Sequence, residues 1–146
     1  MKSKLTILMA EDDADDRLLA EDALAESGVS GALRCVEDGE ELLDYLRREG
    51  DYAKPNAAPR PGIILLDLNM PRKDGREALR EIKGDPDLRR IPIIALTTSK
   101  ENEDVRKTYD LGVSSYIKKP VTFDGLVEVM RTIGKYWFDM VELPAG

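Results

Sequence analysis

The sequence contains no histidine and only one cysteine, Cys35, among its 146 residues. Histidine is the most common general base and metal ligand, so chemistry in this protein must use carboxylates, hydroxyls and lysine. A single cysteine excludes an intramolecular disulfide. The sequence also lacks a signal peptide and any apolar run near the roughly 18 residues that a membrane span requires. We therefore expect a cytoplasmic protein with no membrane partner.

Basic charge and aromatic residues are scarce as well. Lys and Arg number 22 against 29 Asp and Glu, which gives a net charge of −7 and an isoelectric point near 4.8. A negative field repels phosphate backbones, so the composition predicts no nucleic-acid partner. Aromatic residues make up 5%, yet a hydrophobic content of 42% is typical of a folded protein. The length suits one domain, and we expect a single domain over residues 1–146, with a core of about 5–141 and no output domain.

Short apolar runs alternate with amphipathic segments along the whole chain. The first, third and fourth runs are almost wholly apolar, as central parallel strands are, whereas the second contains Arg34 and the fifth is short. Strict alternation indicates a parallel sheet with helices on both faces. The sequence therefore predicts a flavodoxin-like, doubly wound (βα)5 fold of the α/β class, with strand order 2-1-3-4-5. The five predicted strands are Leu5–Ala10, Leu33–Val36, Ile63–Leu66, Ile91–Leu96 and Tyr116–Ile117.

Several predicted helices begin with recognisable capping residues. Asp38 and Asp74 each stand three residues before a glutamate, which is the spacing of a capping box. Thr122 is placed to cap the last helix, with Val121 and Leu126 spaced as a hydrophobic staple. These signals mark where the helices begin. The loops that precede them therefore start at the carboxyl ends of the strands.

Polar side chains that can do chemistry follow four of the five predicted strands. In a doubly wound sheet, the carboxyl ends of the strands converge on one crevice beside the first and third strands. We therefore expect these side chains to meet there, whereas the other acidic residues near position 12 are expected to be only cap and first-turn charges. The converging residues are Glu11 and Asp12 after the first strand, Asp67 after the third, Thr97 at the end of the fourth and Lys119 after the fifth.

Three of these residues are carboxylates that repel one another unless a cation lies between them. Mg²⁺ prefers oxygen ligands and typically takes one or two carboxylates together with phosphate oxygens and water. We expect Asp12 and Asp67 to bind Mg²⁺ directly and Glu11 to act through water. The backbone carbonyl of Asn69 is expected to complete the protein ligands, because the chain turns there before Pro71.

An aspartate carboxylate can attack a phosphoryl group to form an acyl phosphate, provided that the charge on the phosphoryl oxygens is neutralised. A metal ion, the Lys119 ammonium and the Thr97 hydroxyl are groups of the required kinds, and the backbone amide of Thr98 can add a further donor. Taken singly, Asp67 is more simply a helix cap and Lys119 a solvated surface residue. Their coincidence at one sheet edge favours the phosphoryl-transfer interpretation.

Four segments around these residues resemble the receiver domains of bacterial response regulators, over about 5–141. The resemblance implies that Asp67 is the phosphoacceptor, Tyr116 the switch aromatic beside the switch hydroxyl of Thr97, and Lys119 the phosphoryl-binding lysine, with a cis bond before Pro120. It also implies a signalling protein that is not an enzyme, uses Mg²⁺ and receives its phosphoryl group from a sensor histidine kinase. The sequence departs from the family pattern in having Glu rather than the more frequent Asp at position 11 and a bulkier residue at position 98. The segments are Ile-Leu-Met-Ala-Glu-Asp-Asp at 7–13, Leu-Leu-Asp-Leu-Asn-Met-Pro at 65–71, Ile-Ala-Leu-Thr-Thr-Ser at 94–99 and Tyr-Ile-Lys-Lys-Pro at 116–120.

A narrower resemblance concerns residues 68–77, the proline-bearing loop 50–62 and the tail 136–144. These segments are similar to the single-domain regulators that pair with bacterial phytochrome histidine kinases, which implies a light-sensing pathway. The tail continues an apolar face that Phe138 and Val141 widen. The residues of this face are Ile133, Tyr136, Trp137, Met140 and Val141. This face either covers the sheet edge or forms a homodimer interface, and we favour the homodimer because aromatic and Met residues are enriched at buried interface centres.

Other functions fit the sequence less well. An Asp-nucleophile phosphatase carries two aspartates in Asp-x-Asp-x-Thr after the first strand, whereas Asp67 follows the third strand and precedes Leu68. A nucleotide binder of this fold needs an amide cradle after the first strand, where the acidic residues would repel phosphate. A scaffold that is never phosphorylated would have no need of Asp67 or Lys119. A transcription factor would need a basic output domain, so we expect output through protein contacts.

Overall fold

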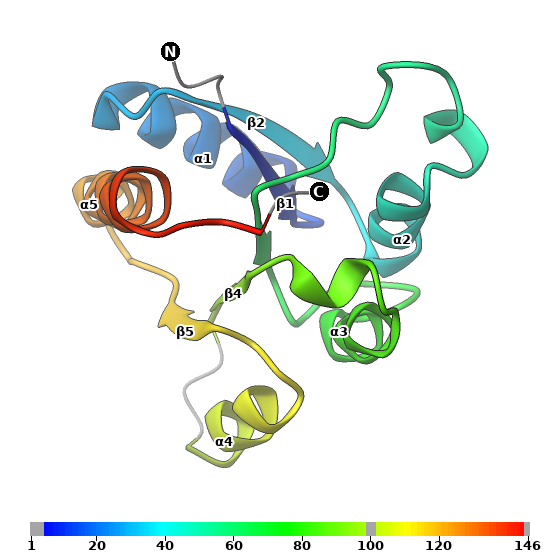
Figure 1. The fold of residues 1–146 in the computed structure, drawn as a ribbon. Helices are drawn as coiled ribbons and strands as arrows, with labels where there is room; N and C mark the ends of the chain where they lie inside the picture. Colours follow the sequence, from blue (N-terminus) through cyan, green and yellow to red (C-terminus); the bar gives the residue numbers. More distant parts are fainter. Residues whose placement is uncertain (1–4, 99–101, 145–146) are drawn as a thin grey trace.

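A five-stranded parallel sheet with strand order β2-β1-β3-β4-β5 lies at the centre of the molecule (Figure 1). The computed structural model describes residues 5–98 and 102–144, and the side chains of residues 104–144 in the second range. The predicted fold class and strand order are confirmed. The strands are β1 (Leu5–Ala10), β2 (Gly31–Val36), β3 (Ile63–Leu66), β4 (Ile93–Thr97) and β5 (Ser115–Lys118).

The starts of two strands differ from the prediction by two residues, whereas β4 ends one residue later than predicted and β5 is one residue longer at each end. β2 begins two residues early, at Gly31, because Gly31 already pairs with Leu5 of β1. β4 begins two residues late, at Ile93. The N–H of Ile91 is bonded instead to the carbonyl of Leu88, which closes a short 3₁₀-helix before the strand.

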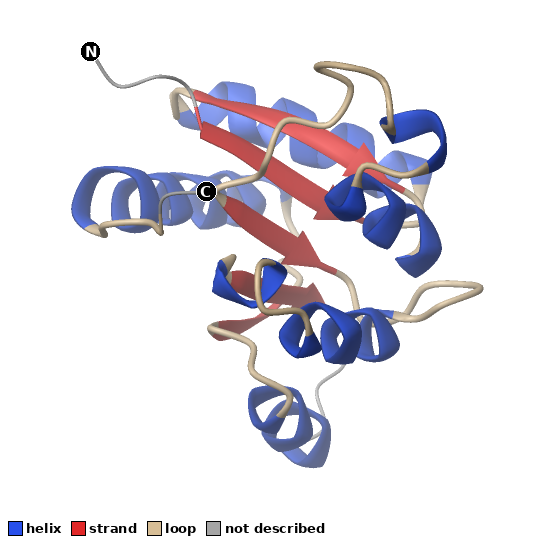
Figure 2. Cartoon of the chain, turned by 45° about the vertical axis from the view of Figure 1, so that its right-hand side comes forward, coloured by secondary structure: helices blue, strands red, loops and turns tan. Residues whose placement is uncertain are grey.

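Helices cover both faces of the sheet (Figures 1 and 2). α1 and α5 pack together on one face, and α2 and α3 pack together on the other, while α4 contacts β5 at the edge. Within residues 5–98 and 102–144, none of the helices has both the length and the apolar character needed to cross a membrane. The helices are α1 (Ala14–Ser27), α2 (Gly39–Arg47), α3 (Gly75–Gly84), α4 (Asn102–Asp110) and α5 (Phe123–Ile133), with 3₁₀-helices at Gly50–Tyr52 and Leu88–Arg90 and a π-helix at Gly134–Met140.

The apolar core is divided by the sheet into two clusters. Neighbouring residues of a strand point to opposite faces, so Ile63 belongs to the cluster under α1 and α5 and Ile64 to the cluster under α2 and α3. Every residue of β3 and β4 is buried. This double-sided burial explains why these strands read as continuous apolar runs in the sequence.

The predicted caps are present, but the predicted staple is wrong. The carboxylates of Asp38 and Asp74 accept the N–H groups of Glu41 and Glu77, at 2.8 and 3.0 Å. The Thr122 hydroxyl likewise caps α5. Val121, however, is 97% exposed and stabilises no contact with the helix that follows. A side chain exposed to this extent does not pack on Leu126, so the spacing suited to a staple is not used.

The C-terminal helix changes from α to π geometry at Gly134. A side chain at Gly134 would collide with Val29, since a Cβ atom there would lie 2.4 Å from Val29 Cγ2. Trp137 and Phe138 are partly buried against the α1/α5 side of the sheet, and Phe138 packs on Gly31 of β2. These two aromatics therefore cover the sheet edge, as one of the two interpretations of the tail required. Tyr136 and Met140 remain exposed, at 52% and 68%.

The close approach at Gly75 yields a test of how the loop after β3 is held. A Cβ atom on Gly75 would lie 2.4 Å from the carbonyl oxygen of Asp67, whereas one on Gly84, at the other end of the same helix, meets nothing within 4 Å. We expect Gly75→Ala to lower the free energy of unfolding by roughly 1–3 kcal/mol. Gly84→Ala should leave it unchanged or raise it by about 0.4–1 kcal/mol. Urea denaturation of both variants decides, and equal midpoints would contradict the steric argument.

Candidate functional site

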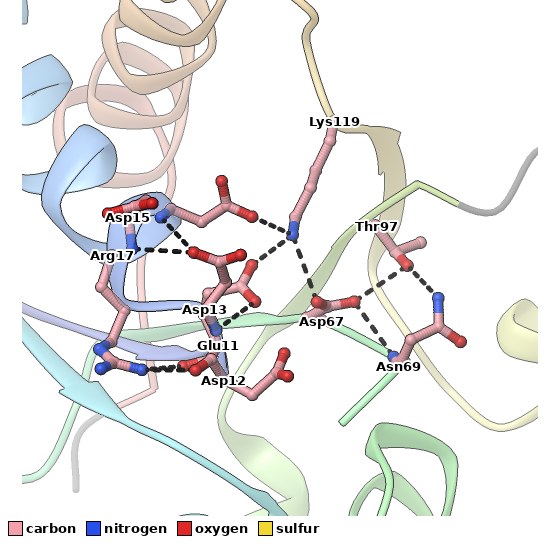
Figure 3. Close-up of polar contacts among 10 residues, drawn as sticks. Glu11, Asp12, Asp13, Asp15, Arg17, Asp67, Asn69, Thr97 and Lys119 are labelled. Carbon is pink, nitrogen blue, oxygen red and sulfur yellow. Dashed lines mark hydrogen bonds and ion pairs between the residues drawn. The ribbon is translucent and has the colours of Figure 1, made fainter. Parts of the chain in front are cut away.

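The carboxyl ends of β1, β3 and β5 and the first turn of α1 bring a lysine ammonium into contact with three carboxylates (Figure 3). Lys119 follows β5, and its Nζ lies 3.3 Å from Asp67 Oδ2 and 3.2 Å from Asp16 Oδ2. The same ammonium also donates to Glu11 Oε1. Glu11 is 1% exposed and Asp67 6% exposed, so the positive charge compensates acidic groups that water scarcely reaches.

Both oxygens of the Asp67 carboxylate are engaged. Oδ2 accepts from Lys119, while Oδ1 accepts from the Thr97 hydroxyl and from the backbone N–H of Asn69, each at 3.1 Å. Thr97 ends β4 and is fully buried, and its hydroxyl also accepts from the Asn69 side-chain amide at 3.4 Å. The N–H of Asp67 itself is bonded to the carbonyl of Ala10. The backbone of Asp67 is therefore fixed by β1, and its carboxylate by Thr97 of β4, Asn69 and Lys119.

Two of the carboxylates that contact Lys119 also form, together with Asp12, a site suited to a divalent cation. Glu11, Asp12 and Asp67 each offer an oxygen, and these oxygens lie within 4.8 Å of one another. Asp12 is exposed, so the site opens to solvent on that side. An all-oxygen donor set that is partly open to water fits a hard divalent ion.

Comparison with known proteins identifies the family. The family model of the response regulator receiver domain matches residues 7–131. The chain is a response regulator receiver domain. It is therefore a signalling protein of a two-component system, and its acidic cluster is of the kind that holds a divalent metal in these domains.

Similar receivers cover nearly the whole chain. Response regulator Rcp1 of Synechocystis sp. is 41% identical over 140 residues, which cover 96% of this chain and 93% of Rcp1, and its Mn²⁺-bound structure superposes with a TM-score of 0.85. The phosphorylated cyanobacterial phytochrome response regulator RcpA is 43% identical, with a TM-score of 0.89 and coverage of 98% and 100%. A response regulator in red light signaling of R. palustris is 37% identical, with a TM-score of 0.92 and coverage of 97% and 99%.

The other predictions from the sequence, for Thr98, Tyr116 and the bond before Pro120, have different outcomes. Thr98 is exposed at the end of β4, and a role for its amide stays a prediction. The Tyr116 hydroxyl donates to Asp104 Oδ2 of α4 at 3.1 Å, so this ring is directed toward α4 and not toward Asp67. The cis peptide bond expected before Pro120 is wrong, because none of the peptide bonds in the described residues is cis. The trans form is the intrinsically preferred isomer of a bond before proline.

Asp16 and Arg17 are site residues that the sequence interpretation missed. Asp16 was expected to be only a first-turn charge, yet its carboxylate contacts Lys119. Asp13 does act as the cap, accepting the N–H groups of Asp15 and Asp16 at 2.8 and 3.2 Å. Because Asp13 caps the helix, Asp16 lies on its first turn, beside the carboxyl edge of the sheet. Recognising Asp13 as the cap in the sequence could therefore have placed Asp16 near the site.

Burial shifts the proton affinities of the two central groups. It raises the pKa of Glu11 to about 7, and the charge of Asp67 adds to the rise, while Lys119 opposes it. Burial alone would lower the pKa of Lys119, but its contacts with Glu11 and Asp67 more than offset this, and the pKa lies above its usual value. Lys119 therefore stays charged at neutral pH. Glu11, in contrast, has a pKa close to neutral pH in the metal-free protein.

This raised pKa predicts a pH-dependent effect of Glu11→Gln. The folded state favours protonated Glu11, so this group stabilises the fold below its usual pKa of 4.5, and that contribution is lost as pH rises through about 7. In the metal-free protein the variant should therefore gain stability relative to wild type between pH 5 and 8, by on the order of 2 kcal/mol. Urea denaturation in EDTA at both pH values measures this gain. A difference that does not change with pH would contradict the assignment.

Proposed function

We propose that this receiver accepts a phosphoryl group on Asp67 from the phosphohistidine of a sensor histidine kinase and passes the signal on through protein contacts. The observation that carries the proposal is the Asp67 carboxylate, held between the Lys119 ammonium and the Thr97 hydroxyl beside two further carboxylates. The similarity to RcpA and to the red-light regulator supports a bacterial phytochrome as the kinase. The proposed pathway is therefore light sensing.

Each neighbour of Asp67 has a defined part in the transfer. One Asp67 oxygen attacks phosphorus, a new O–P bond forms, and the N–P bond to the histidine breaks as the imidazole leaves and takes up a proton. Lys119 and Thr97 donate to phosphoryl oxygens, and Thr98 can add its amide. This chemistry acts on the receiver itself, so we do not propose turnover of an external substrate.

Mg²⁺ is the cation that we propose for the acidic cluster. Asp12 and Asp67 would bind it directly, Glu11 through water, and Asn69 through its backbone carbonyl, as expected from the sequence. The bound ion would neutralise charge that develops on the phosphoryl group. The Mn²⁺-bound structure of Rcp1 supports a divalent ion at such a site.

A groove beside the site supports a protein donor. It has a volume of about 120 Å³, and its lining includes Lys119 together with Leu19 of α1 and Phe123 of α5, which are 44% and 40% exposed. Exposed apolar side chains around a charged centre suit an amphipathic helix of a kinase. The net charge of −7 supports the expected absence of a nucleic-acid or membrane partner and is compatible with a cytoplasmic location.

We propose Thr97 and Tyr116 as the switch. On phosphorylation the Thr97 hydroxyl would move from Asp67 to a phosphoryl oxygen, and Tyr116 would leave Asp104 and turn into the vacated space. Shifting a 1:99 equilibrium to 99:1 takes about 5.5 kcal/mol. Each hydrogen bond to a charged group is worth roughly 1.5–3 kcal/mol, so two or three new bonds to the phosphoryl group suffice. The surface of α4, β5 and α5 would change as a result.

We also propose that the receiver acts as a single domain without an output domain and forms a homodimer. Its similarity to Rcp1 and RcpA over 93% and 100% of those chains supports the single-domain arrangement. For the dimer, the exposed Tyr136 and Met140 are better interface candidates than the half-buried Trp137 and Phe138. They lie one turn apart on the same π-helix.

The phosphoacceptor is tested by intact-mass analysis after incubation with acetyl phosphate and Mg²⁺. We expect the wild-type chain to gain one phosphoryl group, because the carboxylate and its charge-neutralising neighbours are preassembled. Asp67→Asn should gain none, while Asp13→Asn, a change of the same chemistry at the helix cap, should be labelled like wild type. Equal labelling of Asp67→Asn and wild type would remove Asp67 from this role.

The switch is tested by NMR of Tyr116 with and without beryllofluoride, a phosphoryl mimic. Thr97→Ser keeps the hydroxyl and should preserve the mimic-dependent shift, whereas Thr97→Ala should lose most of it. Comparing the two variants separates the effect of losing the hydroxyl from the effect of losing the methyl group. A full shift at Tyr116 in Thr97→Ala would show that the two residues are not coupled.

The dimer is tested by sedimentation equilibrium at micromolar concentration, with and without phosphorylation. We expect wild type to dimerise in at least one state, and the double variant Tyr136→Ala, Met140→Ala to be a folded monomer, because both side chains are exposed. Its stability should fall only by the lost edge-to-face contact between Tyr136 and Trp137, about 0.5–1.5 kcal/mol. Phe138→Ala should instead lower the melting temperature, since it packs on Gly31. A wild-type monomer in both states would refute the dimer.

A further inference from the structure

Arg17 of α1 lies behind the acidic cluster and binds its backbone. Nη1 of the guanidinium donates to the carbonyl oxygen of Glu11 at 2.8 Å and to that of Asp12 at 3.0 Å (Figure 3). Nη2 lies 3.4 Å from Glu37 Oε1, at the end of β2. The Arg17 side chain is only 20% exposed, and its bond to the Glu11 carbonyl is partly buried. One planar group thus bridges two successive carbonyls of the loop between β1 and α1.

These two carbonyls belong to the residues that carry the first two carboxylates of the metal site. β1 ends at Ala10, so Glu11 and Asp12 lie beyond the strand, where the regular pairing of the sheet no longer orients their carbonyl groups. The N–H of Glu11 is still bonded to the carbonyl of Val36. With the carbonyls held by Arg17, the carboxylates extend toward Asp67, where oxygens of all three residues lie within 4.8 Å of one another.

We propose that Arg17 is a positioning residue of the cation site: it fixes the two loop carbonyls and thereby holds the carboxylates of Glu11 and Asp12 at the spacing that a divalent ion needs. The inference rests on the proposed function of these carboxylates as Mg²⁺ ligands. It assigns no contact between Arg17 and the ion. The planar guanidinium suits this task, because Nη1 reaches both carbonyls while Nη2 lies beside Glu37, which fixes the orientation of the whole group.

A second role of Arg17 predicts the opposite effect on Mg²⁺ binding. Arg17 also adds a positive charge beside an acidic segment, and if charge were its whole contribution, removing it would strengthen cation binding. If Arg17 positions the carboxylates, removing it weakens cation binding even though the site becomes more negative. The sign of the change therefore separates the two roles.

The experiment is a calorimetric titration of the full chain with Mg²⁺ at pH 8, where Glu11 is ionised. We expect Arg17→Met to weaken Mg²⁺ binding by about 10–100-fold, the usual cost of losing a residue that orients metal ligands. Arg34→Met removes one positive charge from an exposed position on β2 and should bind Mg²⁺ like wild type. Arg17→Lys keeps the charge but replaces a planar group oriented by both carbonyls and Glu37 with a single flexible ammonium, and should also bind less tightly than wild type.

The outcomes are distinguishable. Equal or tighter binding by Arg17→Met, with far-UV circular dichroism of a folded protein, would overturn the positioning role. If Arg17→Met does not fold, Arg17→Lys decides alone, and wild-type affinity in that variant would overturn the proposal. If wild type binds no Mg²⁺, or Asp12→Ala binds it as wild type does, the proposed metal site itself is wrong, whatever Arg17 does.

Discussion

The ammonium of Lys119 is the interaction on which the functional edge of this receiver depends. Three carboxylates from two parts of the chain converge on it, and two of them are almost completely buried. Without that charge, burial of Glu11 and Asp67 together would be strongly unfavourable, because each ion loses its hydration and repels the other. The lysine thus makes it possible to keep the charged Asp67 carboxylate buried at this edge of the sheet without a bound cation.

The rest of the fold keeps this cluster at a defined geometry. β3 and β4 are buried on both faces, so the strand ends that carry Asp67 and Thr97 have little freedom to move. The loop after β3 is packed against Gly75 so closely that no side chain fits there, and the N–H of Gly39 ties the same loop to α2 through the carbonyl of Lys73. The site is therefore preorganised by backbone packing as well as by charge.

The sequence predicted the parts of this arrangement that depend on local pattern. The apolar runs of β3 and β4 and the caps at Asp38 and Asp74 follow from periodicity and spacing, and topology then brings the strand-end residues together. Asp16 and Arg17 were missed because their contacts depend on how the first turn of α1 faces the sheet. Val121 was wrongly assigned a packing role, since its exposure depends on the path of the loop before α5 and not on its spacing from Leu126.

The contacts of the tail, too, could not be predicted from local sequence pattern. An ideal α-helical period places Phe138 beside the apolar stripe, but the change to π geometry after Ile133 places its ring on Gly31. That change lets the chain pass close to Val29 at Gly134, a contact between residues far apart in the sequence. Periodicity assumes one helical form throughout, so it could not show which aromatics stay outside.

In the switch proposed above, the hydrogen bond from Tyr116 to Asp104 would hold the receiver in its resting conformation. Arg76 of α3 holds the other oxygen of Asp104 through two N–H groups, Nε at 3.1 Å and Nη2 at 2.6 Å, so the acceptor is anchored to the helix that follows the Asp67 loop. A bond of roughly 1.5–3 kcal/mol to a charged group corresponds to a population ratio of about 10 to 150. If this bond breaks when the proposed switch operates, it would suppress background output in the absence of phosphorylation by that ratio, and the same ratio would limit how far phosphorylation can raise output.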